Sequence, residues 1–145
     1  MPFRFPLAAV LLVRENAETR EERALKKIQI ELTRTARQVE ELDAAMAHAH
    51  DAREHALQEP IPSFQLHEYQ RQIEEAAEKK KSLLHQLRIQ RQELGRQMRI
   101  YQGAHRDREM LTGMLKEQRE AYDQEQAREQ QKQVDDMFMA RRRRS

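Results

Sequence analysis

Apolar side chains recur every three or four residues along the second half of the chain, between Leu66 and Tyr122. This repeat assigns 18 positions between residues 66 and 125 to one face; 12 of these are apolar, against 8 of the other 42. Such a period is typical of a long helix packed along a single seam. The apolar seam positions are Leu66, Tyr69, Ile73, Ala76, Leu83, Leu87, Leu94, Tyr101, Ala104, Leu111, Leu115 and Tyr122. We therefore predict a helix over about residues 63–139.

A second seam of the same kind lies upstream. Its positions are Leu25, Ile28, Leu32, Thr35, Val39, Leu42, Met46 and Ala49, of which only Thr35 is polar. They predict a helix over about residues 6–57, with Pro6 in its first turn, where the missing N–H group costs nothing. The two seams are the surfaces that we expect to cover each other.

The first turns of this upstream helix fit two registers. The seam, extended backwards, places polar residues on the packed face: Arg14, Glu18 and Glu21. An apolar stripe offset by about one position consists of Val10, Val13, Ala17 and Ala24. These turns therefore either face another surface or belong to a locally unwound coiled coil.

Two prolines, Pro60 and Pro62, separate the seams and predict a turn over residues 58–62, because proline removes an amide donor and restricts the residue before it. Ser63 is a suitable N-cap for the following helix. So short a connection makes the flanking helices antiparallel neighbours. The predicted fold is all-α: a single domain over residues 1–145 in which two long helices form an antiparallel coiled-coil hairpin.

Folding about this turn places residue i near residue 120 − i, so the second helix is longer than its partner and overhangs it. The overhang runs from Lys116 to Ala140, about 35 Å at the rise of a helix, and a basic tail over residues 140–145 follows it. Four polar residues interrupt the second seam and, at some cost in packing, are candidates for fixing the register. They are Lys80, Gln90, Gln97 and Arg108.

Composition supports an elongated helical protein, since 36% of the residues are charged and only 5% are aromatic. The net charge of +2 includes +4 from Arg141–Arg144, so the remainder sums to −2 and is not a general nucleic-acid-binding surface. The chain has no cysteine, which excludes disulfides, a thiol nucleophile and a cysteine metal site. This composition permits a reducing cytoplasm.

The longest apolar run, Leu7 to Val13, is far shorter than the roughly 20 residues that cross a bilayer. Charged and polar residues follow it at the place where a signal peptide would have a small-residue cleavage site. We therefore expect neither a membrane span nor a secretory signal.

Residues with catalytic potential do not form a recognisable motif. The sequence contains no glycine-rich phosphate loop, and a two-helix rod offers no cavity for a catalytic triad or a carboxylate pair. His50 and Glu54 have a spacing that suits a metal, near His48 and His55, but no third ligand converges on them. We predict no enzyme activity, no cofactor and no metal site.

The chain resembles the FliJ family of flagellar export proteins. Its opening, Phe3-Arg4-Phe5-Pro6-Leu7, leads into a leucine-rich helix with Arg14-Glu15, as the family's Phe-x-Phe start does. The segment from Glu129 to Asp136 is similar to the family's C-terminal Glu/Lys/Asp-Glu segment, with Asp136 where the family usually has Glu. The length and the layout match as well.

This resemblance implies a non-enzymatic stalk similar to the central stalk of rotary ATPases. Its implied partners are the hexameric export ATPase, the cytoplasmic domain of the export gate protein, and substrate chaperones. The implied location is cytoplasmic, peripheral at the cytoplasmic side of the cell membrane. The implied processes are flagellum assembly, motility and chemotaxis.

By the same analogy, the joined end of the rod enters the ATPase ring. The candidate partner-binding residues are Phe3, Phe5, Leu7, Tyr122, Glu129, Lys132, Asp135, Met137 and Phe138. Candidate contacts with an anionic surface are Arg141, Arg142, Arg143 and Arg144, since cations close to a charged membrane bind it electrostatically.

Three alternatives remain open from the sequence. The same fold could serve as the stalk of a virulence-type secretion injectisome. The arginine tail could tether a coiled coil to a membrane or, without sequence specificity, to nucleic acid. The seams could also pair between two chains in a homodimeric scaffold.

Overall fold

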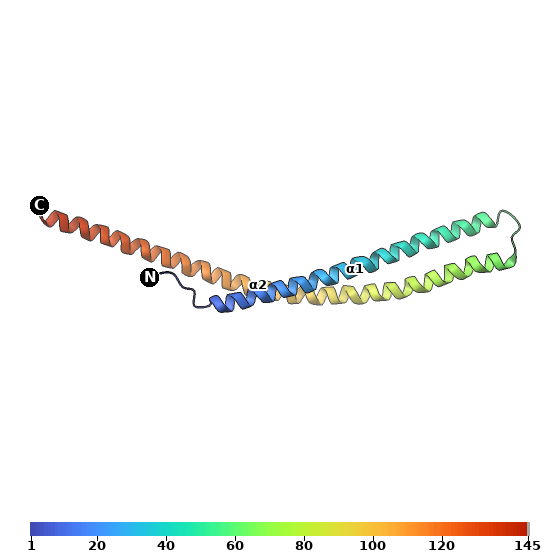
Figure 1. Cartoon of the computed structure of the whole chain (residues 1–145), viewed down its shortest axis with the longest axis horizontal. Helices are drawn as coiled ribbons and strands as arrows, with labels where there is room; N and C mark the ends of the chain where they lie inside the picture. The colour runs from blue at the N-terminus through green and yellow to red at the C-terminus, as the bar shows by residue number, and fades with distance from the viewer. Residues whose placement is uncertain (145) are drawn as a thin grey trace. The chain divides into compact units, whose positions relative to one another are not determined.

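The computed structural model describes residues 1–144 and consists of two α-helices, α1 (Ala8–Ala56) and α2 (Ser63–Arg144) (Figure 1). Within these residues there is no strand, which confirms the all-α fold of two long helices. Contacts group the chain into two compact units, which we describe separately. Unit 1 comprises Met1–Arg20 with Gln102–Ser145, and unit 2 comprises Glu21–Tyr101.

The start of α1 differs from the predicted start. Pro6 lies in the turn before the helix and not in its first turn, since α1 begins at Ala8. The N–H group of Ala8 donates to the carbonyl oxygen of Phe5 at 3.1 Å, and that of Leu11 donates to Leu7 at 2.8 Å. A proline disfavours helical geometry in the residue before it. Phe5 therefore closes the turn and the helix begins only after Pro6.

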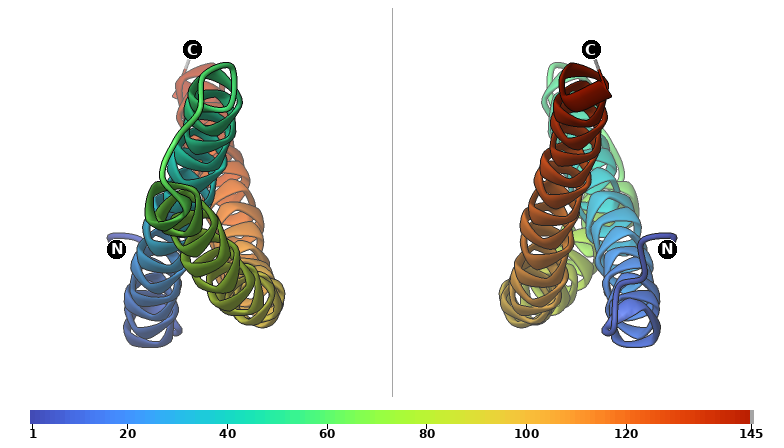
Figure 2. Two further views of the ribbon diagram at one scale, coloured as in Figure 1. Left: turned by 90° about the vertical axis from the view of Figure 1, so that its right-hand side faces the viewer. Right: turned by 90° about the vertical axis from the view of Figure 1, so that its left-hand side faces the viewer.

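In unit 2, the two helices are joined by the segment between Ala56 and Ser63 and run antiparallel (Figure 2, left). On the α1 side, the amide of Leu57 donates to the carbonyl oxygen of Arg53 at 3.0 Å, and those of Gln58 and Glu59 donate to His55 and Ala56. On the α2 side, the amide of Gln65 donates to the carbonyl oxygen of Pro62 at 3.1 Å. The antiparallel two-helix arrangement predicted from the prolines is thus confirmed.

The core of unit 2 is a narrow apolar seam. Leu25, Ile73 and Leu87 are buried, with 6 to 8% of their surface exposed. Thr35, the polar position in the seam, is even more buried because its hydroxyl donates to the carbonyl oxygen of Glu31 at 3.1 Å. A hydroxyl satisfied within its own helix leaves only its methyl group to face the partner helix.

Polar residues in the α2 seam of unit 2 contact α1. Lys80 Nζ lies 2.6 Å from Asp43 Oδ1, and Gln97 Nε2 donates to Glu21 at the backbone oxygen (3.1 Å) and at Oε2 (2.6 Å). The residue numbers of these pairs add to 123 and 118, close to the predicted register of 120. Gln90 differs, since its buried Oε1 has no hydrogen-bond partner within the described chain.

In unit 1, the first turns of α1 face α2 with the polar seam residues and not with the offset apolar residues. Leu11 is the one buried apolar side chain among its described residues, at 9% exposed. Val10 and Val13 of the alternative apolar stripe are exposed, at 43% and 64%. Arg14 and Glu18 instead form bonds to α2. The seam therefore continues into these turns with charged residues.

The C-terminal arginines belong to α2, which is helical as far as Arg144. We had expected a separate tail over residues 140–145, and Ser145 lies outside the described residues. Arginine has a high helix propensity, and cations are favourable at the C-terminal end of a helix dipole.

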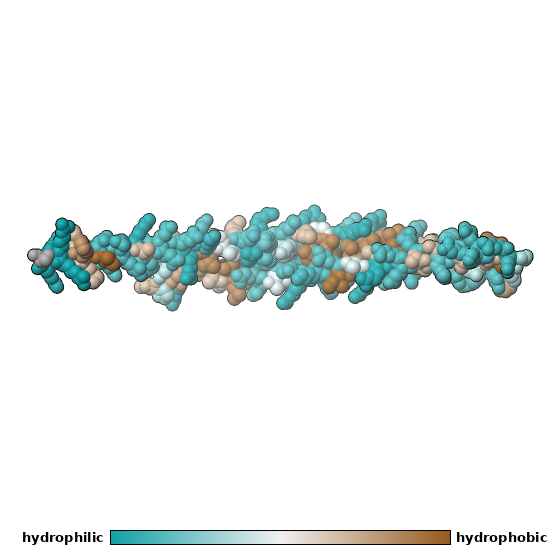
Figure 3. All heavy atoms as spheres, turned by 90° about the horizontal axis from the view of Figure 1, so that it is seen from above, coloured by the Kyte–Doolittle hydropathy of each residue, from teal (hydrophilic) through white to brown (hydrophobic). Residues whose placement is uncertain are grey.

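Hydrophilic side chains dominate the face in Figure 3, with hydrophobic groups scattered between them. Neither helix, over the described residues, contains a stretch long and apolar enough to cross a membrane.

Candidate partner-binding site

The N-terminal segment Met1–Leu7 lies against α2 in unit 1. The rings of Phe3 and Tyr122 are 5.5 Å apart between centroids and tilted by 54°. The guanidinium of Arg119 lies 5.3 Å from the centroid of the Phe3 ring, within the range of a cation–π interaction. The hydroxyl of Tyr122 donates to the carbonyl oxygen of Met1. We call Met1–Leu7 with Arg119 and Tyr122 the N-terminal clasp.

The clasp covers more of α2 than the sequence predicted. Phe5 and Leu7 are half-buried in it, and contacts reach Tyr122 rather than ending near Lys116. An extended residue advances by about 3.3 Å, whereas a helical residue advances by about 1.5 Å. Non-helical residues therefore reach farther along α2 than the same number of helical residues would. The overhang was predicted to begin at Lys116 by counting helical residues alone, and the non-helical residues before Ala8 extend the contact to Tyr122.

The part of α2 from Asp123 to Arg144 is the uncovered end. Its described side chains are exposed except for Gln126, which is half-buried. The predicted residues Glu129 and Lys132 lie here and are exposed, as is Asp135, whose Oδ1 accepts a bond from Gln131 Nε2 at 3.1 Å. The uncovered end therefore presents charged and amide groups over several turns.

Exposed apolar side chains gather on one face of the uncovered end. Val134, Met137 and Phe138 have 58%, 61% and 66% of their surface exposed. Their spacing of three and four residues places them on one side of the helix, and Arg141 extends the same side one turn later. We call Val134, Met137 and Phe138 the apolar stripe of the uncovered end. A helix that displays anchors at this spacing is suited to an apolar groove in another protein.

The candidate residues thus divide between two places. The clasp brings Phe3 and Tyr122 together, with Phe5 and Leu7 beside them, and the rest lie on the uncovered end. Sequence reasoning missed Val134, although its spacing to Met137 and Phe138 was a visible signal. It also missed Arg119, which carries no signal because its role depends on where the N-terminal segment lies.

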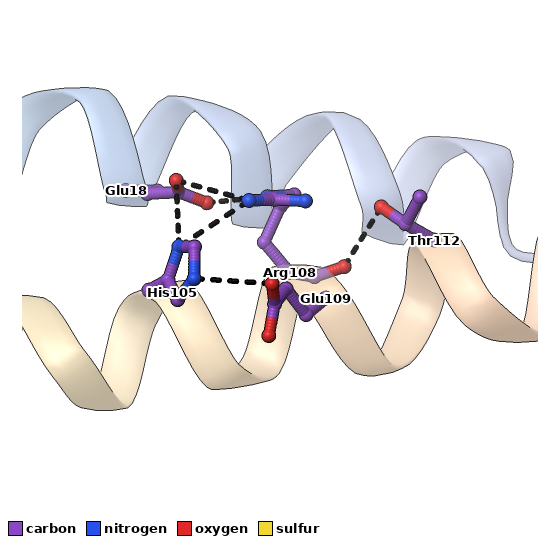
Figure 4. A network of polar contacts seen from close by, with 5 residues as sticks. All are labelled: Glu18, His105, Arg108, Glu109 and Thr112. Atoms are coloured by element: carbon purple, nitrogen blue, oxygen red, sulfur yellow. Dashed lines mark hydrogen bonds and ion pairs between the residues drawn. The ribbon is translucent and has the colours of Figure 1, made fainter.

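Charged residues hold α1 against α2 in unit 1 (Figure 4). Arg108 donates from Nε to Glu18 Oε2 at 2.5 Å and from Nη2 to Oε1 at 3.3 Å. His105 lies between two carboxylates, with Nδ1 3.2 Å from Glu18 Oε1 and Nε2 3.1 Å from Glu109 Oε1. The hydroxyl of Thr112 donates to the backbone oxygen of Arg108 at 3.0 Å. We call Glu18, His105, Arg108 and Glu109 the charged network.

Glu18 is the centre of this network, with 16% of its side chain exposed. The hydrogen bond from Arg108 lowers the pKa of the Glu18 carboxyl, and it outweighs the burial that would raise it. The bond from His105 lowers this pKa further. Glu18 correspondingly raises the pKa of Arg108. The polar seam residue Arg108 therefore has a defined charged partner.

A metal site would need several ligating side chains close together within residues 1–144. No group of three or more histidine, cysteine, aspartate or glutamate residues is placed to hold a metal ion there, and this includes the surroundings of His50 and Glu54. The arginines Arg141–Arg144 are exposed on the last turn of α2. The arrangement is that of a helical surface able to bind a macromolecule.

The sequence model of one protein family, described as "Flagellar FliJ protein", matches residues 3–145. The match includes the clasp except for Met1 and Pro2, both helices, the turn between them and the uncovered end. Comparison with curated proteins and with solved structures found no match.

Proposed function

This chain belongs to the FliJ family of flagellar proteins, and from this membership we propose that its uncovered end docks on the hexameric export ATPase. Membership makes the protein a component of the flagellar export apparatus, with a role in flagellum biogenesis and protein export. The resemblance that began with Phe3–Leu7 is thereby confirmed. We propose that its contribution is structural and not catalytic.

The observation that carries the proposal is the apolar stripe on a stretch of helix without cover. Val134, Met137 and Phe138 are more than half exposed in a chain that is otherwise strongly charged. Burying each such side chain in a partner would contribute about 1.5–3 kcal/mol, minus the cost of association. Such residues are therefore the natural anchors of an interface, and the charged residues beside them fit its rim.

The further partners are proposed on the family resemblance alone. We propose that the cytoplasmic domain of the export gate protein contacts unit 2, and that substrate chaperones bind transiently. These partners would hold the protein at the cytoplasmic side of the membrane. The match to a flagellar family supports the flagellar machine over the injectisome.

The experiment uses the purified cognate ATPase hexamer and measures its ATP hydrolysis and its binding to the full chain. The test variant carries Met137→Ser and Phe138→Ser, and the matched control carries Leu84→Ser, an exposed leucine of unit 2. We expect the test variant to bind at least tenfold more weakly and to lose its effect on hydrolysis. The control should behave like the unmodified chain.

A truncation after Gln126 gives a second, independent reading. It removes the apolar stripe but keeps Tyr122 and therefore the N-terminal clasp. Normal binding and hydrolysis with both the double variant and this truncation would refute docking through the uncovered end.

A second candidate function rests on the arginines. Arg141–Arg144 follow directly on the exposed Met137, Phe138 and Met139, and a helix that combines apolar and basic side chains suits an anionic membrane surface. Sedimentation with vesicles of anionic phospholipid, with the four arginines replaced by glutamine as the variant, tests this. Equal binding of both proteins would exclude it.

A further inference from the structure

Charged residues on α1 of unit 2 form two blocks of equal length and opposite sign. Residues 23–37 contain five cations and one acid, a net charge of +4, and residues 40–54 contain five acids and one cation, a net charge of −4. The basic block consists of Arg23, Lys26, Lys27, Arg34 and Arg37 with Glu31; the acidic block consists of Glu40, Glu41, Asp43, Asp51 and Glu54 with Arg53. The whole-chain charge of +2 conceals this separation.

Both blocks contribute to one exposed face. Residues spaced by three and four positions on the side of α1 opposite the Leu25 seam make up what we call the outer stripe. They are Arg23, Lys27, Ile30, Arg34, Arg37, Glu41, Ala44, His48, Asp51 and His55, and all ten are exposed. Ile30, with 61% of its surface exposed, is the one large apolar side chain among them.

Most of these charges have no partner of their own. Lys26 is paired with Glu22 at 3.3 Å, and Asp43 is paired with Lys80. Among residues 1–144, the charged residues of the two blocks without an ion pair include Arg23, Lys27, Arg34, Arg37, Glu40, Glu41, Asp51 and Glu54. They are available to another surface, and they lose few existing bonds on meeting it.

We propose that two copies of this chain associate through the outer stripe of α1, side by side and antiparallel, with each basic block against the acidic block of the other copy. A two-fold axis near residue 39 would place residue i beside residue 78 − i of the partner, as in any isologous contact. Lys27 then meets the partner's Asp51, and Arg37 meets the partner's Glu41. Ile30 meets the partner's His48, and the smallest side chain, Ala44, meets the partner's Arg34.

A second copy fits this surface better than a lipid bilayer or a nucleic acid does. Both of those are uniformly anionic, so they would attract the basic block and repel the acidic one. The outer stripe has a single exposed isoleucine and no aromatic residue, which offers little to insert into lipid or to stack on bases. A surface with a positive block followed by a negative block is complementary to a second copy of itself in the antiparallel orientation.

The α2 side of unit 2 repeats the separation. Residues 79–99 carry seven cations against Glu93, and residues 63–78 carry four acids against Arg71. In the antiparallel register of unit 2, these segments lie beside the basic and acidic blocks of α1 respectively, as the pair Asp43–Lys80 shows at their boundary. In the antiparallel arrangement, the charges of α1 and those of α2 in unit 2 therefore both attract the second copy.

Because exposed ion pairs are individually weak and are screened over about 8 Å at physiological salt, we expect a dissociation constant in the micromolar range that rises with salt. Sedimentation velocity of the full chain at about 100 μM should show a dimer in about 50 mM salt and mostly monomer in about 500 mM salt. Monomer alone in low salt, or a dimer indifferent to salt, would overturn the proposal.

Charge reversal identifies the surface. One variant carries Lys27→Glu, Arg34→Glu and Arg37→Glu, and the other carries Glu40→Lys, Glu41→Lys and Asp51→Lys. Each alone should be monomeric in low salt, and an equimolar mixture should form heterodimers. The control reverses Arg128 and Lys132, which lie outside unit 2, and should dimerise normally. Circular dichroism confirms that all variants remain helical.

Because the chain has no cysteine, single cysteines report the register. A mixture of the Lys27→Cys and Asp51→Cys variants should crosslink as a heterodimer, whereas Lys27→Cys alone should not crosslink to itself. Equal crosslinking in both samples would overturn the antiparallel register. A monomer that binds anionic vesicles through the basic block would instead assign this surface to the membrane. None of these outcomes depends on the export ATPase, so they are independent of the proposed function.

Discussion

Unit 2 and unit 1 contain the same two helices, yet different forces hold them. In unit 2, Leu25, Ile73 and Leu87 are buried along the seam, and polar residues there add cross-helix bonds. In unit 1, Leu11 is the one buried apolar side chain of the described residues, Leu111 and Leu115 of the α2 seam are half-buried, and Glu18 bonds to Arg108 and His105 in the same seam. One pair of helices therefore passes from a mainly apolar contact to one in which charged residues share the seam.

This difference has a physical consequence. Apolar burial is non-directional and scales with area, so it is insensitive to pH and to moderate salt. A charged contact depends on the ionisation and orientation of each partner, and it weakens as salt screens it. We expect unit 2 to set the stability of the fold and unit 1 to respond to its surroundings.

The largest expected effect is on the apolar seam. Replacing Leu87, 6% exposed, with alanine should lower the free energy of unfolding by about 2–3 kcal/mol, because the buried side chain leaves a cavity. Leu84→Ala is the matched control, since Leu84 is 45% exposed on the same helix, and should cost less than about 1 kcal/mol. Urea denaturation followed by circular dichroism measures both. Equal losses would contradict an apolar seam.

The next largest effect is expected when a substitution removes the anionic centre of the charged network, Glu18. In Glu18→Gln, Arg108 and His105 lose their charged acceptor, so amide protection over residues 8–20 should fall by up to about tenfold. Protection around Leu25 should stay the same. Glu117→Gln, on an exposed residue of unit 1, is the control. Hydrogen exchange measured by mass spectrometry reports the amide protection of each segment. A uniform loss of protection over both units would argue against a local role of Glu18.

A smaller effect follows from pH. The pKa of Glu18 is lowered below its ordinary value of 4.5, so the unfolded state binds a proton before the folded state does. The stabilisation by this carboxylate is complete above about pH 5 and is lost as pH falls through the lowered pKa. Protection factors over residues 8–20 should therefore fall between about pH 5 and pH 3 in the unmodified chain. They should change less in Glu18→Gln.

The amides around Leu25 serve as the internal reference for this titration. The turn of unit 2 would be a poor reference, because Arg71 also lowers the pKa of Glu68 there through a hydrogen bond. A pH response of the same size in Glu18→Gln would assign the effect to other carboxylates.

The smallest effect concerns the N-terminal clasp. Phe3→Ala removes the contact with Tyr122 and the cation–π interaction with Arg119, together worth about 1 kcal/mol at an exposed site. Trypsin should then cleave after Arg4 a few times faster, because the segment leaves α2 more often. Phe138→Ala, which removes an exposed ring from the uncovered end, should not change this rate.

Much of the fold could be predicted from the sequence because its signals are local or periodic. The 3-4 repeat identified Leu25, Ile73 and Leu87 as seam residues, and Pro60 with Pro62 marked the turn. Counting from that turn gave the register of unit 2 to within a few residues. Periodicity and proline chemistry hold in any helical hairpin, so no further information was needed.

The parts that could not be predicted depend on contacts between distant residues. Glu18 and Arg108 were visible as polar seam residues, but their pairing depends on which of two registers the first turns adopt. The position of Phe3 on Tyr122 follows from a segment without periodicity. The charge blocks of α1 are visible in the sequence. Which of their residues share one exposed face follows only from the packing of the seam.

The non-helical segment Met1–Leu7 also sets how far the clasp reaches along α2. Pro2 and Pro6 oppose its conversion to helix, and that conversion would shorten each extended residue by about 1.8 Å. One residue inserted here would move the anchor at Phe3 along α2 by about two helical positions, whereas one inserted in α1 would move it by one. The number of residues before Ala8 therefore determines where on α2 the free surface begins.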